Sequence, residues 1–568
     1  MANQRGRAIE AEGLRFRYSS RAEPTLRGID LAQSLGEMVV LSGPSGAGKT
    51  TFTQCLNRII PTYHPGQLEG AIRLLGKPLP AGEINELTGV IGLVFQEFEA
   101  QIFSSSVELE VAFGPSNLGV EREELLRRVR ESLEKVGLAG LERRDPQTLS
   151  GGQKQRLAIA SLLALRPQIL VMDEATTDLD PAGKEEIFGV ARALADEGMA
   201  LLLVDHTASR LRSADRLALM AEGQIVATGE PDGLLRDAAV MARAGLPVNE
   251  IAMLGREIGM PALPLDPAAA YQALRKAGWR VEQSLAVESQ PAGEPGGAPA
   301  CGEVMVEAKG VRFAYPGGLE ALRGVDLQIR EGDFVAVLGE NGSGKSTLCL
   351  LLIGLLGAQE GECVVQGRAT RQLAKPEIGR VVGYVHQNPD VQLYAATVEE
   401  EVAFAAENLG FGEAEVTVAV GEALEATGLQ GERKSNPFTL SRGERERVAV
   451  ASVLAARPKV VILDEPTTGL DWVEQERVMG VLQEVNGRGT AVVIVTHSIP
   501  LAARYARRCV VLSRGELVAD APPREVLTDT GLLARAALRA PDITQLGSLL
   551  GVQALTAREL ASVLRRQT

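Results

Sequence analysis

Two stretches of the chain, Gly43-Pro-Ser-Gly-Ala-Gly-Lys49-Thr50 and Gly339-Glu-Asn-Gly-Ser-Gly-Lys345-Ser346, share one pattern and decide the fold. Each follows a short apolar run, at residues 37–43 and 333–339, and each precedes a segment that reads as a helix. Glycines allow the backbone to wrap closely around a phosphate group with several N–H groups pointing inward. The helix N-terminus behind such a loop adds partial positive charge. The pattern therefore predicts two phosphate-binding loops, each between a strand and a helix.

The last two residues of each loop have distinct predicted roles. We expect Lys49 and Lys345 to reach the β- and γ-phosphates of a nucleotide. The hydroxyl groups of Thr50 and Ser346 are expected to hold Mg²⁺.

The chain is a tandem repeat, because the later motifs recur in the same order in both halves. Lys49 and Lys345 are 345 − 49 = 296 residues apart, and the next motifs recur at an offset of 291, as in 387 − 96. The motifs with this offset are Gln96 and Gln387, Leu149-Ser-Gly-Gly-Gln153 and Leu440-Ser-Arg-Gly-Glu444, Asp173-Glu174 and Asp464-Glu465, and His206 and His497.

Each copy is predicted to be an α/β domain with a parallel sheet. Residues 168–172 and 459–463 are continuous apolar runs, which is the pattern of parallel strands that are buried on both faces. A small helical piece is repeated as well, because Ile251, Leu254, Gly255 and Gly259 recur as Ile543, Leu546, Gly547 and Gly551.

The predicted domain organisation follows from these repeats. A Pro/Gly-rich stretch between the copies cannot bury a core and reads as a linker. The predicted parts are a first nucleotide-binding domain at 1–235, a helical extension at 236–287, a linker at 288–302, a second nucleotide-binding domain at 303–530 and a second extension at 531–568.

Two adjacent carboxylates stand at the end of each of the apolar runs 168–172 and 459–463. These runs follow the motifs Leu149-Ser-Gly-Gly-Gln153 and Leu440-Ser-Arg-Gly-Glu444, here called the LS-G motifs. Asp173 and Asp464 are placed to join a Mg²⁺ shell, and Glu174 and Glu465 to polarise an attacking water. Each aspartate lies 23 residues after the LS-G serine (173 − 150 and 464 − 441), so a merely solvated strand end is rejected.

The composition excludes several other classes of function. With 59 Lys+Arg and 73 Asp+Glu, the 568-residue chain has a formal net charge of −14, which argues against broad contact with nucleic-acid phosphates. No apolar run reaches the roughly 20 residues that a membrane span needs. The five cysteines are scattered without a CxxC, which favours reduced thiols over a disulfide framework or a zinc site.

The motifs together resemble those of ABC ATPases over nearly all of both halves. The resemblance implies a head-to-tail pair of nucleotide-binding domains, formed within the chain, that encloses two ATP molecules and Mg²⁺. Lys49 and Thr50 would share a site with Ser441 and Gly443. Lys345 and Ser346 would share a site with the signature motif at residues 150–153.

The same resemblance assigns the remaining site residues. It implies that Tyr18 and Tyr315 stack on adenine, that Gln96 and Gln387 contact Mg²⁺ and sense a partner protein, and that His206 and His497 act with Glu174 and Glu465 in catalysis. The full set of implied nucleotide-binding residues is Tyr18, Gly43, Ser45, Gly46, Gly48, Lys49, Thr50, Thr51, Gln96, Ser150, Gly151, Gly152 and Gln153 in the first half, and Tyr315, Gly339, Asn341, Gly342, Gly344, Lys345, Ser346, Thr347, Gln387, Ser441, Arg442, Gly443 and Glu444 in the second.

One departure from the family pattern distinguishes the halves. Arg442 replaces a glycine where backbone approaches phosphate, and Glu444 replaces a glutamine. We therefore expect the Lys49 site, which would use this second signature, to turn over more slowly than the Lys345 site.

A narrower resemblance is carried by Asn388-Pro-Asp-Val-Gln392 and by the runs 398–404 and 107–113. These are similar to ATPase subunits of energy-coupling factor (ECF) transporters, which import vitamins and transition-metal ions into prokaryotic cells. The resemblance implies a motor at the cytoplasmic face of the membrane that works with a transmembrane coupling protein and a small substrate-binding membrane protein. In the first half Glu97-Phe98-Glu99 departs from Asn-Pro-Asp, which suggests a different docking surface.

Other classes remain open at this point. The alternatives are an ATPase of another ABC transporter class and a soluble tandem ATPase that acts on ribosomes. The ribosome class carries a long charged helical arm between its two domains, whereas the connector here is rich in Pro and Gly. The transported substrate is not readable from the motor.

Overall fold

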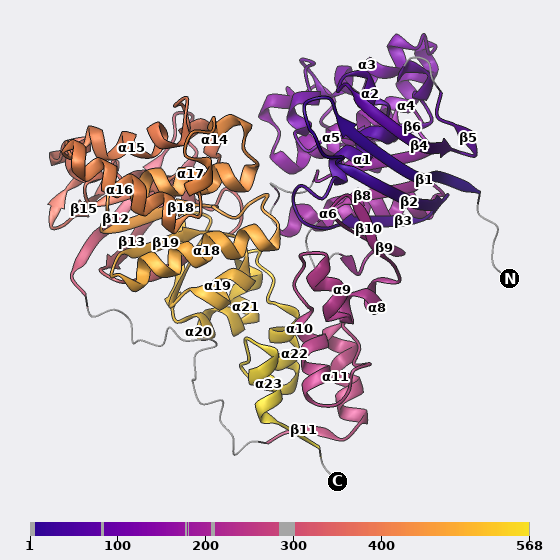
Figure 1. Ribbon diagram of the computed structural model, residues 1–568. Coiled ribbons are helices and arrows are strands. Elements are labelled where there is room, and N and C mark those ends of the chain that lie inside the picture. The colour runs from indigo at the N-terminus through magenta and orange to yellow at the C-terminus, as the bar shows by residue number, and fades with distance from the viewer. Residues whose placement is uncertain are drawn as a thin grey trace. The chain divides into compact units, whose positions relative to one another are not determined.

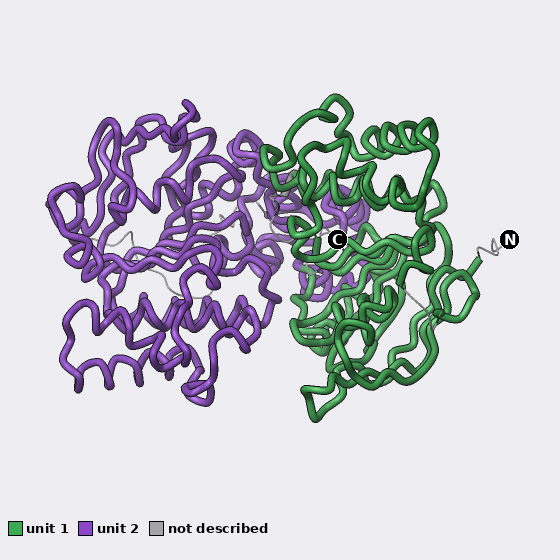
Figure 2. Tube along the Cα trace, turned by 90° about the horizontal axis from the view of Figure 1, so that it is seen from above, with its two compact units in different colours: residues 1–249 green, residues 250–568 purple. Residues whose placement is uncertain are grey.

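The computed structural model describes residues 6–80, 84–175, 179, 181–205, 211–282 and 302–566 (Figure 1). The chain divides into two compact units, residues 1–249 and 250–568 (Figure 2). The predicted linker at 288–302 lies outside the described residues except for Gly302, as does Cys301. The boundary at residue 249 falls inside the predicted helical extension at 236–287.

Unit 1 contains a six-stranded sheet in which five strands, β9, β3, β8, β7 and β6, are parallel. The strand order is β10-β9-β3-β8-β7-β6, with β10 antiparallel to β9. The bounds are β3 (Met38–Ser42), β6 (Ile91–Val94), β7 (Ile169–Asp173), β8 (Ala200–Val204), β9 (Arg216–Ala221) and β10 (Gln224–Gly229). Every residue of β3, β7 and β8 is buried, which confirms the parallel-sheet prediction.

A second, antiparallel sheet and a set of helices cover the two faces of this sheet. The antiparallel sheet has the order β2-β1-β4-β5, with bounds β1 (Arg7–Tyr18), β2 (Leu26–Ser34), β4 (Gly66–Leu74) and β5 (Lys77–Pro78). One apolar core joins it to β3, β7 and the loop helix α1 (Lys49–Leu56). The remaining helices include α3 (Val107–Asn117), α4 (Arg122–Lys135), α5 (Gly151–Leu163), α6 (Pro181–Asp196), α8 (Pro231–Arg236) and α9 (Ala238–Arg243).

Unit 2 repeats this architecture element by element. Its parallel sheet has the order β17-β18-β19-β14-β20-β21 and its antiparallel sheet the order β13-β12-β15-β16. The strands are β12 (Val304–Ala314), β13 (Glu320–Arg330), β14 (Phe334–Leu338), β15 (Glu360–Val365), β16 (Arg368–Ala369), β17 (Val382–Val385), β18 (Val460–Asp464), β19 (Ala491–Val495), β20 (Arg508–Ser513) and β21 (Glu516–Ala521).

Two apolar cores lie on opposite faces of the unit 2 sheet. One joins the sheet to the loop helix α12 (Lys345–Leu352) and the antiparallel sheet. The other joins it to the helical layer, where α15 (Val398–Asn408), α16 (Glu413–Ala426) and α17 (Arg442–Leu454) pack on one another and α18 (Trp472–Gly487) packs on β19. The predicted α/β class, with a parallel sheet in each half of the chain, is thereby confirmed.

The two repeated helical pieces pack together inside unit 2. Helices α10 (Glu250–Glu257) and α11 (Pro267–Lys276) from the first piece contact α23 (Ala557–Val563) and α22 (Asp542–Leu550) from the second. Strand β11 (Trp279–Val281) pairs antiparallel with β22 (Leu564–Arg566). The repeated positions Leu254 and Leu546 are both fully buried. Two sequence copies that are almost 300 residues apart therefore share one small core.

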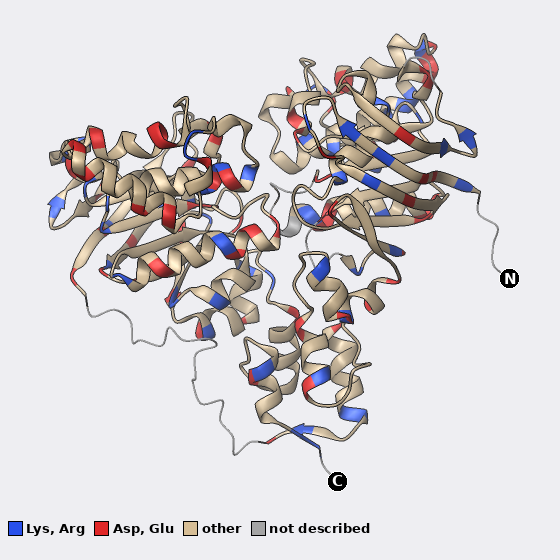
Figure 3. Ribbon diagram, in the orientation of Figure 1, with Lys and Arg blue, Asp and Glu red and all other residues tan. Residues whose placement is uncertain are grey.

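Basic and acidic residues are interspersed along the ribbons of both units (Figure 3). No helix in the described part of the chain is both long enough and apolar enough to cross a bilayer. The four described cysteines are free and buried; they are Cys55, Cys349, Cys363 and Cys509.

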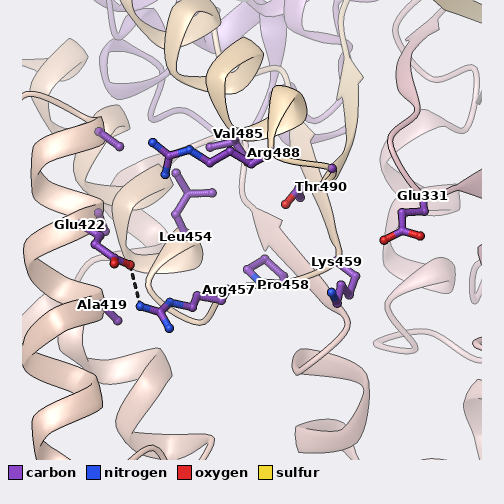
Figure 4. Close-up of a pocket in the computed structure, with 13 residues that line it drawn as sticks. Glu331, Ala419, Glu422, Leu454, Arg457, Pro458, Lys459, Val485, Arg488 and Thr490 are labelled. Atoms are coloured by element: carbon purple, nitrogen blue, oxygen red, sulfur yellow. Dashed lines mark hydrogen bonds and ion pairs between the residues drawn. The ribbon is translucent and has the colours of Figure 1, made fainter.

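Unit 2 also has a cavity of about 360 Å³ next to α16, at the edge of the sheet where β18 and β19 begin (Figure 4). The cavity is lined by Arg457, Lys459, Arg488 and Thr490, among others. Arg457 forms an ion pair with Glu422 at 2.6 Å. In unit 1 the residues at the repeat positions of Ala426 and Arg488 are Lys135 and Glu197, which form an ion pair. The cavity lies at the opposite end of β18 from Asp464, away from the phosphate loop.

Candidate functional site

The phosphate loops have the backbone geometry that their glycines predict. Gly43 has φ 151°, and a Cβ there would lie 1.9 Å from the carbonyl oxygen of Met220. Gly48 has φ 98° and begins α1 in the left-handed region. Gly339 and Gly344 repeat this geometry with φ 156° and 103°. Any side chain at these positions would strain or displace the loop.

Both loop lysines are almost fully buried and lie inside the loop. The Nζ of Lys49 donates to the carbonyl oxygens of Gly43 and Pro44 at 3.0 and 2.9 Å. The Nζ of Lys345 donates to those of Gly339 and Glu340 at 2.9 and 2.8 Å. The two ammonium groups are therefore held where a phosphate in the loop would meet them.

In unit 1, the predicted Mg²⁺ residues meet at the end of β7. The hydroxyl of Thr50 donates to Asp173 Oδ1 at 3.3 Å. Thr53, which belongs to no motif, donates its hydroxyl to Asp173 Oδ2 at 2.8 Å and shares it with the Thr50 carbonyl oxygen at 2.9 Å. Burial raises the pKa of Asp173 to about 6, although the two hydroxyls oppose the rise.

In unit 2, Asp464 has the same place at the end of β18. Tyr384, another residue that the motifs did not identify, donates its hydroxyl to Asp464 Oδ2 at 3.2 Å. Burial raises the pKa of Asp464, and the nearby Ser346 opposes part of that rise. Asp464 Oδ1 is buried and has no hydrogen-bond partner among the described residues.

Glu465 and His497 form a close pair in unit 2. His497 Nδ1 lies 3.1 Å from Glu465 Oε2, and the Thr468 hydroxyl donates to the same oxygen at 2.8 Å. Burial alone would raise the pKa of Glu465, but the His497 and Thr468 contacts outweigh it and lower the pKa to about 2. This glutamate is therefore an ionised, oriented hydrogen-bond acceptor at neutral pH.

In unit 1, Glu174 contacts the other predicted site residues. Its Oε1 lies 3.7 Å from Lys49 Nζ, and its Oε2 accepts from Gln96 Nε2 at 3.1 Å. Glu174 and Glu465 both have positive φ, 48° and 52°, which turns each side chain out of the strand end. The predicted His206 lies outside the described residues.

Gln96 and Gln387 occupy the same place in the fold but have different contacts. Gln96 reaches Glu174, as described above, whereas Gln387 is exposed. The turn that follows each glutamine is built alike: Gln101 Oε1 accepts from Phe95 N, and Gln392 Oε1 accepts from His386 N, both at 3.1 Å. Glu97-Phe98-Glu99 therefore forms the same local turn as Asn388-Pro-Asp, although the residues differ.

The signature serines cap their helices. Ser150 begins α5 and forms a reciprocal capping box with Gln153. Ser441 begins α17 and forms the same box with Glu444, but its hydroxyl also donates to the Glu444 carboxylate at 2.7 Å. Because Glu444 is a carboxylate, the second signature holds negative charge where the first has a neutral amide.

The substituted Arg442 and the unchanged Gly443 of the second signature are tightly packed. A Cβ on Gly469 would lie 2.7 Å from Arg442 Cζ, so the guanidinium lies against that backbone turn. A Cβ on Gly443 would lie 2.7 Å from a carboxylate oxygen of Glu474. In the first signature, a Cβ on Gly151 or Gly152 would lie 3.8 Å from Leu179 Cδ2, which is an ordinary van der Waals distance.

The predicted adenine-stacking tyrosines lie next to the loop helices. The Tyr18 hydroxyl lies 3.1 Å from Thr51 Oγ1, and the Tyr315 hydroxyl 3.1 Å from Thr347 Oγ1. The remaining predicted loop residues, Ser45, Gly46, Asn341 and Gly342, lie in the turns before α1 and α12.

The residues present fit Mg²⁺ with a nucleotide. Each site combines a hydroxyl, a buried carboxylate and a glutamine, and oxygen donors of this kind suit a hard cation. The buried Asp464 Oδ1 without a partner is an acceptor that a cation shell would satisfy.

The sequence comparisons agree with the motifs that form this site. A family model described as ABC transporter matches residues 26–177 and 322–468.

The chain belongs to the ABC transporter family.

The chain is similar to whole proteins of this family. An ABC transporter ATP-binding protein of Caldanaerobacter subterraneus subsp. tengcongensis is 41% identical over 98% of this chain and 99% of its own length. One of Methanosarcina mazei is 37% identical over 98% of this chain and 96% of its own. The solved structure of cbiO1 from Clostridium perfringens, described as part of the ABC transporter complex cbiONQ, is 32% identical over 43% of this chain and 99% of its own, with a TM-score of 0.39.

The chain is thus an ABC transporter ATP-binding protein with two tandem cassettes. It binds ATP and hydrolyses it.

Proposed function

We propose that this ABC ATPase is the motor of an ECF-type importer for a vitamin or a transition-metal ion. It would act with a transmembrane coupling protein and a small substrate-binding membrane protein. The observation that supports this is an exposed aromatic pair beside the glutamine turn of each unit.

The aromatic pair of unit 2 is presented rigidly. Tyr394 and Phe404 pack edge to face with ring centroids 4.6 Å apart and are 55% and 46% exposed. The buried Glu401 holds the loop below them, because its Oε2 accepts from the backbone N–H groups of Tyr394 and Ala395 at 2.8 and 2.7 Å. Large apolar groups that are held in the solvent mark an interaction surface.

Unit 1 presents an equivalent pair. Phe103 and Phe113 have centroids 4.6 Å apart and are 63% and 48% exposed. Glu110 accepts from the backbone N–H groups of Phe103 and Ser104 at 3.1 and 2.8 Å. Two matched apolar patches, one in each unit, suit two short helices of a membrane protein at the cytoplasmic face of a prokaryotic membrane.

Within each site, the residues would divide the work of ATP hydrolysis. The loop N–H groups and Lys49 or Lys345 would bind the phosphates. Thr50 or Ser346, with Asp173 or Asp464, would hold Mg²⁺, which when bound offsets charge on the β- and γ-phosphate oxygens. Gln96 and Gln387 would complete that set of ligands.

The carboxylate after the aspartate would orient the attacking water. Glu465 accepts a hydrogen bond from the water while His497 fixes its carboxylate, and Glu174 with His206 has the same role. We also propose that each site is completed by the signature of the other half. Lys49 would then work with Ser441, and Lys345 with Ser150.

Co-purification from membranes tests the proposal. The full chain, isolated from detergent extract of its own source, should bring a transmembrane protein and a second small apolar membrane protein. Tyr394→Ser with Phe404→Ser should remove both while ATP binding persists, and Val518→Ser, which changes an equally exposed apolar residue on β21, should remove neither. Recovery of one membrane partner without the small protein would assign another ABC class, and sedimentation with ribosomes would contradict the proposal.

A further inference from the structure

The aspartates at the ends of β7 and β18 are held at the same oxygen by different side chains. Thr53 donates to Asp173 Oδ2 at 2.8 Å in unit 1. Tyr384 donates to Asp464 Oδ2 at 3.2 Å in unit 2. The donors come from different elements, since Thr53 is on the loop helix α1 and Tyr384 is on the neighbouring strand β17.

At the repeat position of each donor, the other unit has a residue without a hydroxyl group. The residue of unit 2 that corresponds to Thr53 is Cys349 (53 + 296). The residue of unit 1 that corresponds to Tyr384 is Leu93 (384 − 291). Each unit therefore has one hydroxyl donor and one poor donor or non-donor at this pair of positions.

The surroundings explain why one donor is needed. Asp173 and Asp464 are each 2% exposed, so water has little access to their carboxylates. A buried carboxylate oxygen without a donor costs free energy and leaves the side chain free to rotate. A donor on one oxygen fixes the group, so that the other oxygen faces the ligand site, and such outer partners commonly change metal affinity 10–100-fold.

We propose that Thr53 and Tyr384 are positioning residues that orient Asp173 and Asp464 toward the Mg²⁺ of bound nucleotide. Either position can supply the donor, so the lack of a hydroxyl at Cys349 and at Leu93 is compensated by the other position of the same unit. This inference rests on the proposed assignment of the two aspartates to Mg²⁺.

Metal affinity in the full chain tests the inference without relying on turnover. Mn²⁺ serves as a paramagnetic substitute, and its binding with a non-hydrolysable ATP analogue is followed by electron paramagnetic resonance. Asp173→Asn leaves the Asp464 site to be measured alone, and Asp464→Asn leaves the Asp173 site.

At the Asp464 site, Tyr384→Phe removes only the hydroxyl and should weaken Mn²⁺ binding about tenfold. Adding Cys349→Thr should restore most of that loss, because it supplies the donor that unit 1 uses. At the Asp173 site, Thr53→Val should weaken binding similarly, and Leu93→Tyr should restore it. Tyr384→Phe should leave the Asp173 site unchanged.

The outcomes distinguish the assignment of the aspartates to Mg²⁺ from the positioning role of Thr53 and Tyr384. If Asp464→Asn does not alter Mn²⁺ binding at its own site, the proposed metal assignment fails. If Asp464→Asn abolishes binding but Tyr384→Phe leaves it unchanged, the positioning role fails. The inference also fails if Tyr384→Phe weakens Mn²⁺ binding, the added Cys349→Thr does not restore it and the two variants have equal thermal stability. A packing defect at position 384, and not the lost donor, would then explain the weaker binding.

Discussion

The two cassettes of this chain share a backbone plan and differ in how they satisfy the same buried groups. One aspartate is held from a helix and the other from a strand. The buried Gln155 of α5 corresponds to Glu446 of α17, a carboxylic acid in place of an amide. The aspartates show that the same hydrogen bond can be made by a different residue in each unit, whereas Gln155 and Glu446 fill the same buried position with side-chain atoms that have no partner among the described residues.

A second kind of difference changes the chemistry itself. The Ser441 hydroxyl donates to Glu444, and the Arg442 guanidinium lies against Gly469. In the first signature, Ser150 accepts from the Gln153 N–H, and no carboxylate of the described residues accepts from its hydroxyl. The second signature therefore has a guanidinium and a carboxylate where the first has a glycine and a neutral amide, and its serine hydroxyl is already engaged.

The largest expected effect separates the two catalytic glutamates. Glu465→Gln should lower ATPase turnover about 10²–10⁴-fold, because it replaces the carboxylate that we propose orients the attacking water with a neutral amide. Glu174→Gln should lower turnover by less than about twofold, since the proposed pairing combines its site with the altered second signature and we expect that site to contribute little. Steady-state ATPase assays of the purified chain check this, and equal losses would contradict the asymmetry.

The next effect concerns the shared core of the helical pieces. Leu254→Ala and Leu546→Ala should each destabilise that core by about 2–5 kcal/mol, because both side chains are fully buried. Hydrogen exchange should rise in residues 250–282 and 542–566 for either variant and stay unchanged in β14 and β18. Exchange that rises in only one piece would show that the two pieces do not form one cooperative core.

A smaller, pH-dependent effect distinguishes Glu446 from Gln155. Burial raises the pKa of Glu446 to about 8. Because the folded state then holds this proton more tightly than the unfolded state, the free energy of unfolding should fall as pH rises from about 4.5 to about 8. Glu446→Gln should thus stabilise unit 2 by about 1–3 kcal/mol at pH 8 and by almost nothing at pH 4.5.

Urea unfolding of both proteins at pH 4.5, 6 and 8 measures this difference. Gln155→Glu is the matched control, since it should give unit 1 the same loss of stability with rising pH. A Glu446→Gln effect that is equal at all three values would rule out the buried proton as its cause.

The smallest expected effect is repair of the second signature. Arg442→Gly with Glu444→Gln, made in the Glu465→Gln background, should raise the remaining turnover up to about tenfold, or about 1.4 kcal/mol of barrier. The same pair of changes in a Glu174→Gln, Glu465→Gln chain should give no increase. Unchanged turnover in the first background would mean that the second signature does not limit the Lys49 site.

The motif residues could be predicted from the sequence because their chemistry requires fixed residue types. Glycine at positions 43 and 48 and the strand that ends at Asp173 are set by local backbone geometry and apolar pattern. Thr53 and Tyr384 were missed because neither belongs to a motif. Their roles depend on which side chains the packed strands and helices bring against an aspartate.

By itself, the sequence determined that the chain holds two nucleotide-binding cassettes, because the loop, strand and signature patterns each need only nearby residues. The tertiary structure alone decided that residues 250–282 join the core of the second repeated piece, because strand pairing and helix packing depend on contacts between distant segments. It also decided which hydroxyl holds each aspartate, since a buried acceptor takes whichever donor the packing places within hydrogen-bond distance.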